Sequence, residues 1–175
     1  MTTLIAFGGR GTGKTAVARE LARGLGAVYL RIDSIEQALR SSGLLHKPIE
    51  DVGYRVAYAL AEENLRLGRT VIADSVNPLQ ITRDAWLAVA DRAGAGIVEV
   101  EVACSDSKQH QQRIEHRVSD ISGLKLPTWQ EVASREYEPW QREHIVIDTA
   151  SKSVRGNVND NNSGVRIFQV EPVFE

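Results

Sequence analysis

Residues 8–15 read Gly8-Gly9-Arg10-Gly11-Thr12-Gly13-Lys14-Thr15, which fits the pattern G-x-x-x-x-G-K-[ST] of a phosphate-binding P-loop. The apolar stretch Leu4-Ile5-Ala6-Phe7 precedes this segment, and a helical pattern follows it from Ala16. A glycine-rich turn without a binding role would need neither the lysine nor the hydroxyl after the last glycine. The segment therefore predicts a strand, a loop and a helix that bind a nucleotide.

The residue types of the loop suit a triphosphate and its metal ion. Glycine lets the backbone curl tightly, so that successive N–H groups point at phosphate oxygens. Lys14 is expected to reach the β- and γ-phosphates, while the Thr15 hydroxyl binds Mg²⁺ and the helix directs its positive dipole end at the same charge. We therefore expect ATP and Mg²⁺ as cofactors. The nucleotide-binding residues are predicted to be Gly8, Gly9, Arg10, Gly11, Thr12, Gly13, Lys14 and Thr15.

The composition describes one ordinary globular domain. Of the 175 residues, 42% are apolar and 25% are charged, and the formal net charge is −2. Cys104 is the only cysteine, which excludes an intramolecular disulfide and favours a cytoplasmic setting. No apolar run approaches membrane-spanning length, so we expect neither export nor a membrane anchor. The mixed charges make nucleic acid a less favoured partner without excluding it.

Strand and helix patterns alternate along the chain. Strands are predicted at residues 3–7, 27–32, 70–73, 97–103 and 144–148. Helices are predicted at residues 14–25, 49–67, 107–118 and 128–138, with a short helix after Ser34 and another after Asn77-Pro78. Residues 151–164 are predicted to form a polar loop, and residues 165–170 a terminal strand. The alternation predicts an α/β fold, with a parallel sheet between helices.

Two aspartates follow predicted strands, at the sheet edge where such folds bind ligands. Asp74 follows Val71-Ile72-Ala73, the pattern of an acidic residue that holds Mg²⁺ directly or through water. A strand-end turn is the alternative for Asp74. Asp33 ends the second strand, where a carboxylate can orient an acceptor hydroxyl and take its proton. A helix-capping or magnesium-shell carboxylate is an equally good interpretation of Asp33.

Arg113 and Arg117 are spaced i, i+4 in the predicted helix 107–118, so both are expected on one face of it. From that face they are expected to close over the phosphates and neutralise charge in the transition state. A solvated helix face is the alternative interpretation. The four histidines have no metal-ligand spacing with carboxylates or cysteine, so none is assigned to a metal.

Four segments together resemble the small P-loop kinases related to chloramphenicol phosphotransferase, the 5′-kinase domain of polynucleotide kinase, and zeta toxins. These segments are residues 8–15, residues 31–35 (Arg31-Ile32-Asp33-Ser34-Ile35), residues 71–77 and Arg113-x-x-x-Arg117. The third segment, with the later Arg83 and Trp86, is similar to the Asp-x-x-Asn stretch of polynucleotide kinases. The resemblance implies that Asp33 is the general base, that Lys14 positions the phosphates, and that Arg113 and Arg117 are lid arginines.

The resemblance also implies an architecture. The expected fold is a three-layer P-loop kinase, with a mostly parallel five-stranded sheet of order 2-3-1-4-5, helices on both faces and a small lid. Residues 1–175 are expected to form one domain, in which residues from about 107 to 140 are the lid and acceptor region. An acceptor pocket is expected between residues 33–54 and the lid residues Trp129 and Tyr137. Residues 127–140 resemble uncharacterised ATP-binding members of the group, which leaves the acceptor open.

Other P-loop classes lack their signatures in this sequence. It contains neither the Asn-Lys-x-Asp of guanine-specific GTPases nor the Leu-Ser-Gly-Gly of transporter ATPases, and ring-forming ATPases usually need a longer chain. The sequence therefore favours a kinase that moves the γ-phosphate of ATP to a small-molecule hydroxyl. A polynucleotide 5′-hydroxyl kinase, a toxin-like nucleotide-sugar kinase and a non-transferring ATPase switch are the alternatives.

Overall fold

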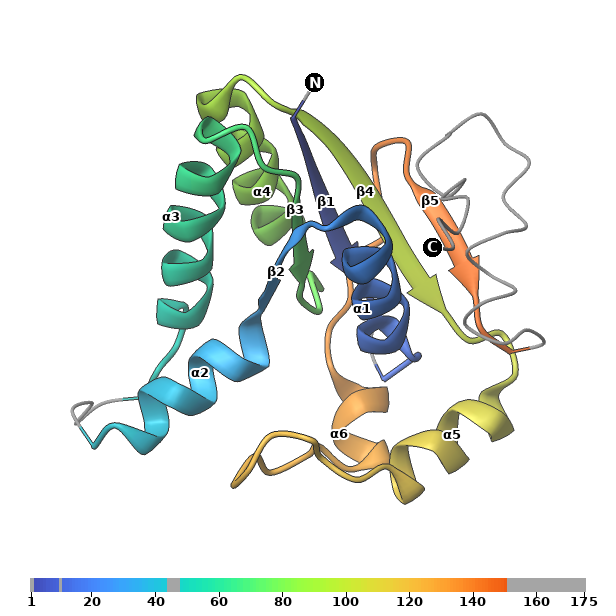
Figure 1. The fold of residues 1–175 in the computed structure, drawn as a ribbon. Helices are drawn as coiled ribbons and strands as arrows, with labels where there is room; N and C mark the ends of the chain where they lie inside the picture. The colour runs from blue at the N-terminus through green and yellow to red at the C-terminus, as the bar shows by residue number, and fades with distance from the viewer. Residues whose placement is uncertain (1, 10, 44–47, 151–175) are drawn as a thin grey trace, which may run out of the picture.

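The computed structural model describes residues 2–9, 11–43 and 48–150 (Figure 1). Arg10, the predicted polar loop 151–164 and the predicted strand 165–170 lie outside these residues. The strands are β1 (Thr3–Gly8), β2 (Val28–Arg31), β3 (Val71–Asp74), β4 (Gly96–Ala103) and β5 (Ile145–Asp148). The helices are α1 (Lys14–Leu25), α2 (Ile32–Ser41), α3 (Val52–Arg66), α4 (Gln80–Ala93), α5 (Ser107–His116) and α6 (Trp129–Ser134).

The strands form one sheet in the order β2-β3-β1-β4-β5, and each neighbouring pair is parallel. The predicted strand order is confirmed, and the described sheet is wholly rather than mostly parallel. Figure 1 shows the carboxyl ends of the strands at one end of the molecule, where α2, α5 and α6 also lie. Ligand sites of parallel sheets occur at this edge.

Helices cover both faces of the sheet because the central strand β1 is apolar on both of its faces. Leu4 and Ala6 are buried in one cluster with residues of α3 and α4, whereas Ile5 and Phe7 are buried in another with residues of α1. Such a doubly buried strand is typical of parallel sheets. Burying each large apolar side chain stabilises the fold by roughly 1.5–3 kcal/mol. The three-layer prediction is therefore confirmed.

The second strand is shorter than predicted. It ends at Arg31, and α2 begins at Ile32, so Asp33 lies in the first turn of α2 instead of at a strand end. The β-branched Ile32 extends the apolar pattern of the strand in the sequence. In the fold, its side chain is buried in the core cluster of α3 and α4, and Arg31 has the extended backbone of a helix N-cap. Tertiary packing thus moves the boundary.

Two predicted helices also end early. The helix α5 ends at His116, and Arg117 has extended backbone angles (φ −70°, ψ 142°), so Arg113 and Arg117 do not share a helix face. The next residue, Val118, is 91% exposed, which leaves the helix no apolar contact there. The helix α6 begins with the predicted capping box of Thr128 and Glu131 and ends at Ser134, before the predicted Glu138.

A buried arginine holds the segment after α6 against the β3–α4 turn. Arg83 is 1% exposed, and its guanidinium donates to the carbonyl oxygens of Asn77 (3.0 Å), Pro139 (3.0 Å), Pro78 (3.2 Å) and Glu138 (2.7 Å). The ring of Trp140 lies 4.2 Å from the Arg83 Cζ atom, which adds a cation–π contact. Arg83 thus connects α4 to the chain that leads into β5.

Replacing Arg83 by leucine is expected to lower the free energy of unfolding by about 3–5 kcal/mol, because four carbonyl oxygens lose a buried donor. The measurement is urea unfolding followed by circular dichroism. Arg92→Leu is the matched control on the same helix, since the Arg92 side chain is 52% exposed and pairs with Glu62 at the surface. Equal, small losses in both variants would show that the Arg83 contacts do not stabilise the fold.

Candidate active site

The P-loop connects β1 to α1 and leaves the first turn of the helix open to an anion. Gly13 is the N-cap of α1 with φ 92°, a left-handed conformation, and glycine has no side chain with which to cap the helix. The unpaired N–H groups and the helix dipole at such an end attract phosphate. At the start of the loop, the Gly9 N–H donates to the carbonyl oxygen of Val76 at 3.0 Å, which fixes the loop to the segment after β3.

Gly9 is the loop position that tolerates a side chain least. A Cβ atom there would lie 2.3 Å from the backbone oxygen of Val102, and the φ of Gly9 is +127°. Gly9→Ala is therefore expected to cost about 3 kcal/mol of stability and to weaken nucleotide binding, since the loop must move. Gly26→Ala is the control, because Gly26 also has a positive φ (+58°) but faces open space, and about 1 kcal/mol is expected there. Thermal unfolding and calorimetric ADP titration measure both effects, and similar losses in both variants would refute the packing argument.

Lys14 and Asp74 form a buried ion pair at the centre of the site. The Lys14 ammonium contacts Oδ1 of Asp74, and the Tyr29 hydroxyl donates to Oδ2 at 2.5 Å. Burial acts to raise the pKa of Asp74. The Lys14 charge and hydrogen bonds from Lys14, Tyr29 and Thr15 outweigh burial and hold that pKa below its ordinary value. Asp74 is therefore a carboxylate at neutral pH.

The surroundings of Asp74 fit a magnesium ion beside a bound nucleotide. Thr15 hydrogen-bonds to the Asp74 carboxylate, so a hydroxyl and a carboxylate, both hard oxygen ligands, lie next to each other at the start of α1. Among the described residues, no group of three or more His, Cys, Asp or Glu side chains is placed to hold a metal ion. Mg²⁺ commonly takes one or two protein groups and completes its shell with phosphate oxygens and water, and Thr15 and Asp74 could supply those groups.

Arg113 supports the P-loop through Thr149, the residue that follows β5. Its guanidinium donates to Oγ1 and to the carbonyl oxygen of Thr149, each at 2.8 Å, and Thr149 Oγ1 donates to the carbonyl oxygen of Thr12 at 2.6 Å. The end of β5 is thus connected to the loop. In this conformation Arg113 contacts Thr149, and its predicted contact with phosphate would require the side chain to turn.

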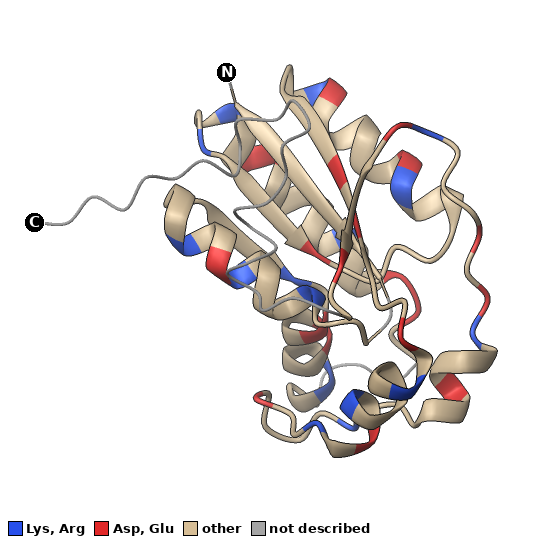
Figure 2. Ribbon diagram, turned by 90° about the vertical axis from the view of Figure 1, so that its right-hand side faces the viewer, with Lys and Arg blue, Asp and Glu red and all other residues tan. Residues whose placement is uncertain are grey.

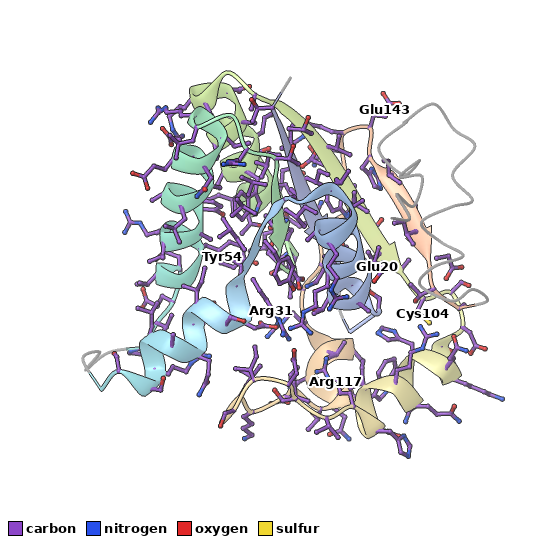
Figure 3. The ribbon with its side chains drawn as sticks, viewed as in Figure 1. Glu20, Arg31, Tyr54, Cys104, Arg117 and Glu143 are labelled. Atoms are coloured by element: carbon purple, nitrogen blue, oxygen red, sulfur yellow. The ribbon has the colours of Figure 1, made fainter. Side chains whose placement is uncertain are left out.

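Asp33 lies in the first turn of α2, just after the carboxyl end of β2, and Arg117 follows the last residue of α5. The Asp33 side chain is 47% exposed, and its Oδ2 lies 3.7 Å from Nη2 of Arg31. Burial lowers the pKa of the Arg117 guanidinium, and the Asp33 carboxylate partly offsets this. Figure 3 shows Arg31 and Arg117 entering the same region from β2 and from the segment after α5. An accessible carboxylate thus lies among arginines beside the P-loop.

Trp129 and Tyr137 do not line the same space as Asp33. They contribute to a cavity of about 290 Å³ with the P-loop residues Gly9 and Thr12 and with Cys104 after β4. The lining of this cavity includes no residue between 33 and 54. Trp129 also lines a cavity of about 460 Å³ together with Arg117, so an acceptor pocket between residues 33–54 and the lid stays a prediction.

Three residues of the site were not predicted from the sequence. Tyr29 lies two residues before Arg31 on the same face of β2, and that alternation is the signal that would have indicated it. Arg19, on α1, and Asp120, between α5 and α6, form an ion pair with each other. Neither residue belongs to a motif, and only the fold brings them together.

Comparison with known proteins places this site in a family. The sequence model of one family, described as an AAA domain, matches residues 4–139. The chain belongs to the AAA domain family. No curated protein matches it. The P-loop pattern of residues 8–15 accords with this membership, and the sheet order and layers are those of P-loop kinases among the solved structures.

Solved structures support the fold assignment. A gluconokinase from Sinorhizobium meliloti 1021 is 20% identical with a TM-score of 0.59, and the match covers 89% of this chain and 87% of that one. A sugar kinase from Janibacter sp. HTCC2649 is 15% identical with a TM-score of 0.60 and 90% coverage of both chains. Kti12 from Chaetomium thermophilum, in complex with ADP-AlF3, is 21% identical with a TM-score of 0.57, covering 87% of this chain and 94% of that one. At these identities the similarity establishes the fold.

The distribution of charged residues and the hydropathy of the helices are two further features of the described residues. Figure 2 shows Lys and Arg interspersed with Asp and Glu over the ribbon. Nowhere in residues 2–9, 11–43 and 48–150 does a helix have the length and apolar character needed to cross a membrane.

Proposed function

We propose that the protein is an ATP-dependent kinase that transfers the γ-phosphate to a hydroxyl group of a small molecule, with Asp33 as general base. The observation that carries the proposal is that two carboxylates lie near the P-loop in different environments. Asp74 is buried against Lys14, whereas Asp33 is about half-exposed, at the open side of the same sheet edge. A protein that only hydrolyses ATP has no acceptor alcohol, so it needs no second carboxylate to activate one.

The P-loop residues, the two carboxylates and the two arginines are each assigned a role in this reaction. On nucleotide binding, the Lys14 ammonium leaves Asp74 and contacts the β- and γ-phosphates, while N–H groups of the P-loop other than that of Gly9 hold the phosphate oxygens. Thr15 and Asp74 would hold Mg²⁺, which neutralises charge on the β- and γ-oxygens. Asp33 accepts the proton of the acceptor hydroxyl, and Arg117 is assigned to stabilise the charge that develops. Arg113 is assigned the same stabilising part once it turns from Thr149.

Small-molecule alcohols are the proposed acceptors, and sugar acids are the first to test, since one of the structural neighbours is a gluconokinase. The resemblance to chloramphenicol phosphotransferase, polynucleotide kinase and zeta toxins adds drug-like alcohols, 5′-hydroxyl ends and nucleotide sugars. A net charge of −2 and interspersed charges favour nucleic acid less.

An ATPase that does not transfer phosphate is the second candidate, favoured by the family description AAA domain. It differs from the kinase in one respect that an assay detects, because its turnover of ATP does not depend on an alcohol. We therefore propose to measure ADP formation with Mg²⁺ alone and with separate pools of sugar acids and polyols, phenicol-like and aminoglycoside-like alcohols, nucleotide sugars, and 5′-hydroxyl oligonucleotides. A kinase is expected to respond to one pool at least tenfold over the basal rate. A rate that no pool changes would favour the ATPase.

A further inference from the structure

Two arginines beside the candidate active site share one carboxylate. Both oxygens of Asp120 accept from Nη1 of Arg31, at 2.9 Å and 3.1 Å, and Arg19 donates to Oδ2 of the same carboxylate. Arg19 comes from α1, Arg31 from the end of β2, and Asp120 from residues 117–128, which we call the α5–α6 segment. The two arginines therefore already form a site for one anion, which a side chain of the protein occupies.

Arg31 is buried in the fold, whereas Arg19 and Asp120 are exposed. The Arg31 side chain is 9% exposed, and the Asp120 side chain is 46% exposed. Within the part of the chain that the structure describes, the buried Nε atom of Arg31 makes no hydrogen bond, and its ion-pair distance to Oδ2 of Asp74 is 3.9 Å. Asp120 is exposed and lies outside any helix or strand, and an anionic group that accepts from Arg19 and Arg31 would replace the hydrogen bonds that Asp120 makes.

Positive charge would remain if Asp120 moved away. Arg117 also lies in this region, and its buried Nε atom has no hydrogen-bond partner among the described residues. Asp33 Oδ2 lies 3.7 Å from Nη2 of Arg31, and the Asp74 carboxylate near Nε of Arg31 already pairs with Lys14. A neutral alcohol would accept single N–H bonds from these donors without balancing their charge, whereas a carboxylate or phosphate group accepts paired N–H bonds from arginine and neutralises it.

We propose that Arg19 and Arg31 bind an anionic group, carboxylate or phosphate, of the acceptor, and that Asp120 occupies this place in the unliganded protein. The inference rests on the proposed function, because it assigns the charge of the acceptor that Asp33 activates. Binding of the anionic group releases the α5–α6 segment from Arg19 and Arg31. The acceptor is thus an alcohol that carries a negative charge.

The test is calorimetric binding of matched acceptors with the P-loop filled by AMPPNP and Mg²⁺. Gluconate is compared with glucitol, and glycerol 3-phosphate with glycerol, so that the two pairs distinguish a carboxylate from a phosphate. At least one anionic member is expected to bind ten or more times more tightly than its neutral partner, the value of a charged hydrogen bond. Equal affinities in both pairs, or no binding of either anion, would overturn the proposal.

Three variants separate this site from a structural role. Arg31→Gln is expected to remove the preference for the anion. Arg31→Lys keeps the positive charge but lacks the two-pronged guanidinium, and it is expected to retain part of the preference. Asp120→Asn is expected to raise the affinity for the anion about two- to fivefold and to leave the neutral partner unchanged. Arg40→Gln, at an exposed pair with Glu36 on α2, is the control. Weaker anion binding in Asp120→Asn would mean that Asp120 only shapes the segment, and it would contradict the proposal.

Failure of this inference can be distinguished from failure of the proposed function. Phosphate transfer to alcohols without any preference for anionic ones would remove this inference and leave the kinase. Anion binding that depends on Arg31, in a protein that transfers phosphate to no alcohol, would remove the kinase and leave the anion site.

Discussion

Lys14→Ala is expected to lower phosphate transfer by about 10³-fold, because the γ-phosphate loses a positioned, charged donor that stabilises the transition state. The ammonium is buried against Asp74 in the unliganded protein, so it is already held at the loop. Transfer is measured with saturating ATP and the acceptor found in the pool assay. A variant with near-normal transfer would show that residues 8–15 do not position the phosphates.

Removing Lys14 also leaves the Asp74 carboxylate buried without its cation, which is expected to cost about 3–5 kcal/mol of stability in the unliganded protein. The double variant Lys14→Ala, Asp74→Asn is therefore expected to regain stability but not transfer. This separates loss of catalysis from loss of folding. Arg66→Ala, at an exposed pair on α3, is the control for unspecific effects on both readouts.

Asp33→Asn is expected to lower transfer by about 10²-fold or more while the affinity for ATP stays the same. The amide keeps the size of the side chain but cannot take the proton of the acceptor hydroxyl. Asp33 lies in the first turn of α2, outside residues 8–15, so nucleotide binding does not depend on it. Single-turnover transfer and calorimetric nucleotide binding measure the two effects separately.

Asp51→Asn is the matched control for Asp33→Asn, since Asp51 is an exposed carboxylate at the start of α3. It is expected to leave transfer unchanged. Equal transfer by Asp33→Asn and the unmodified protein would remove the general base from the mechanism. A parallel loss of transfer and of ATP affinity would indicate that Asp33 holds the nucleotide site together instead.

Much of the fold could be predicted because local signals agree with it. The pattern of apolar residues placed β1, α1 and α4 almost to the residue, and glycines 26 and 94 end α1 and α4 in left-handed caps. The strand order came from resemblance to known kinases, not from spacing. The boundary between β2 and α2 was missed because Ile32 suits a strand as well as a helix, and only packing against the core of α3 and α4 decides it.

The part of the site built from contacts between distant segments could not be predicted. Asp120 is 89 residues from Arg31 and 101 from Arg19, in a segment without apolar periodicity. The role of Arg83 as a donor to four carbonyl oxygens likewise depends on where the chain after α6 returns. Sequence periodicity reports elements and their buried faces, whereas such long-range pairs depend on how the elements meet.

The central claim is that the γ-phosphate moves from ATP to a hydroxyl group. The most direct test uses ATP labelled with ¹⁸O in the γ-phosphate, incubated with the protein, Mg²⁺ and the pool that stimulates ADP formation, followed by mass spectrometry of all phosphate-containing products. Labelled phosphate on an organic acceptor, absent with Asp33→Asn, is the predicted result. Label found entirely in inorganic phosphate, in equal amounts with both proteins, would contradict it.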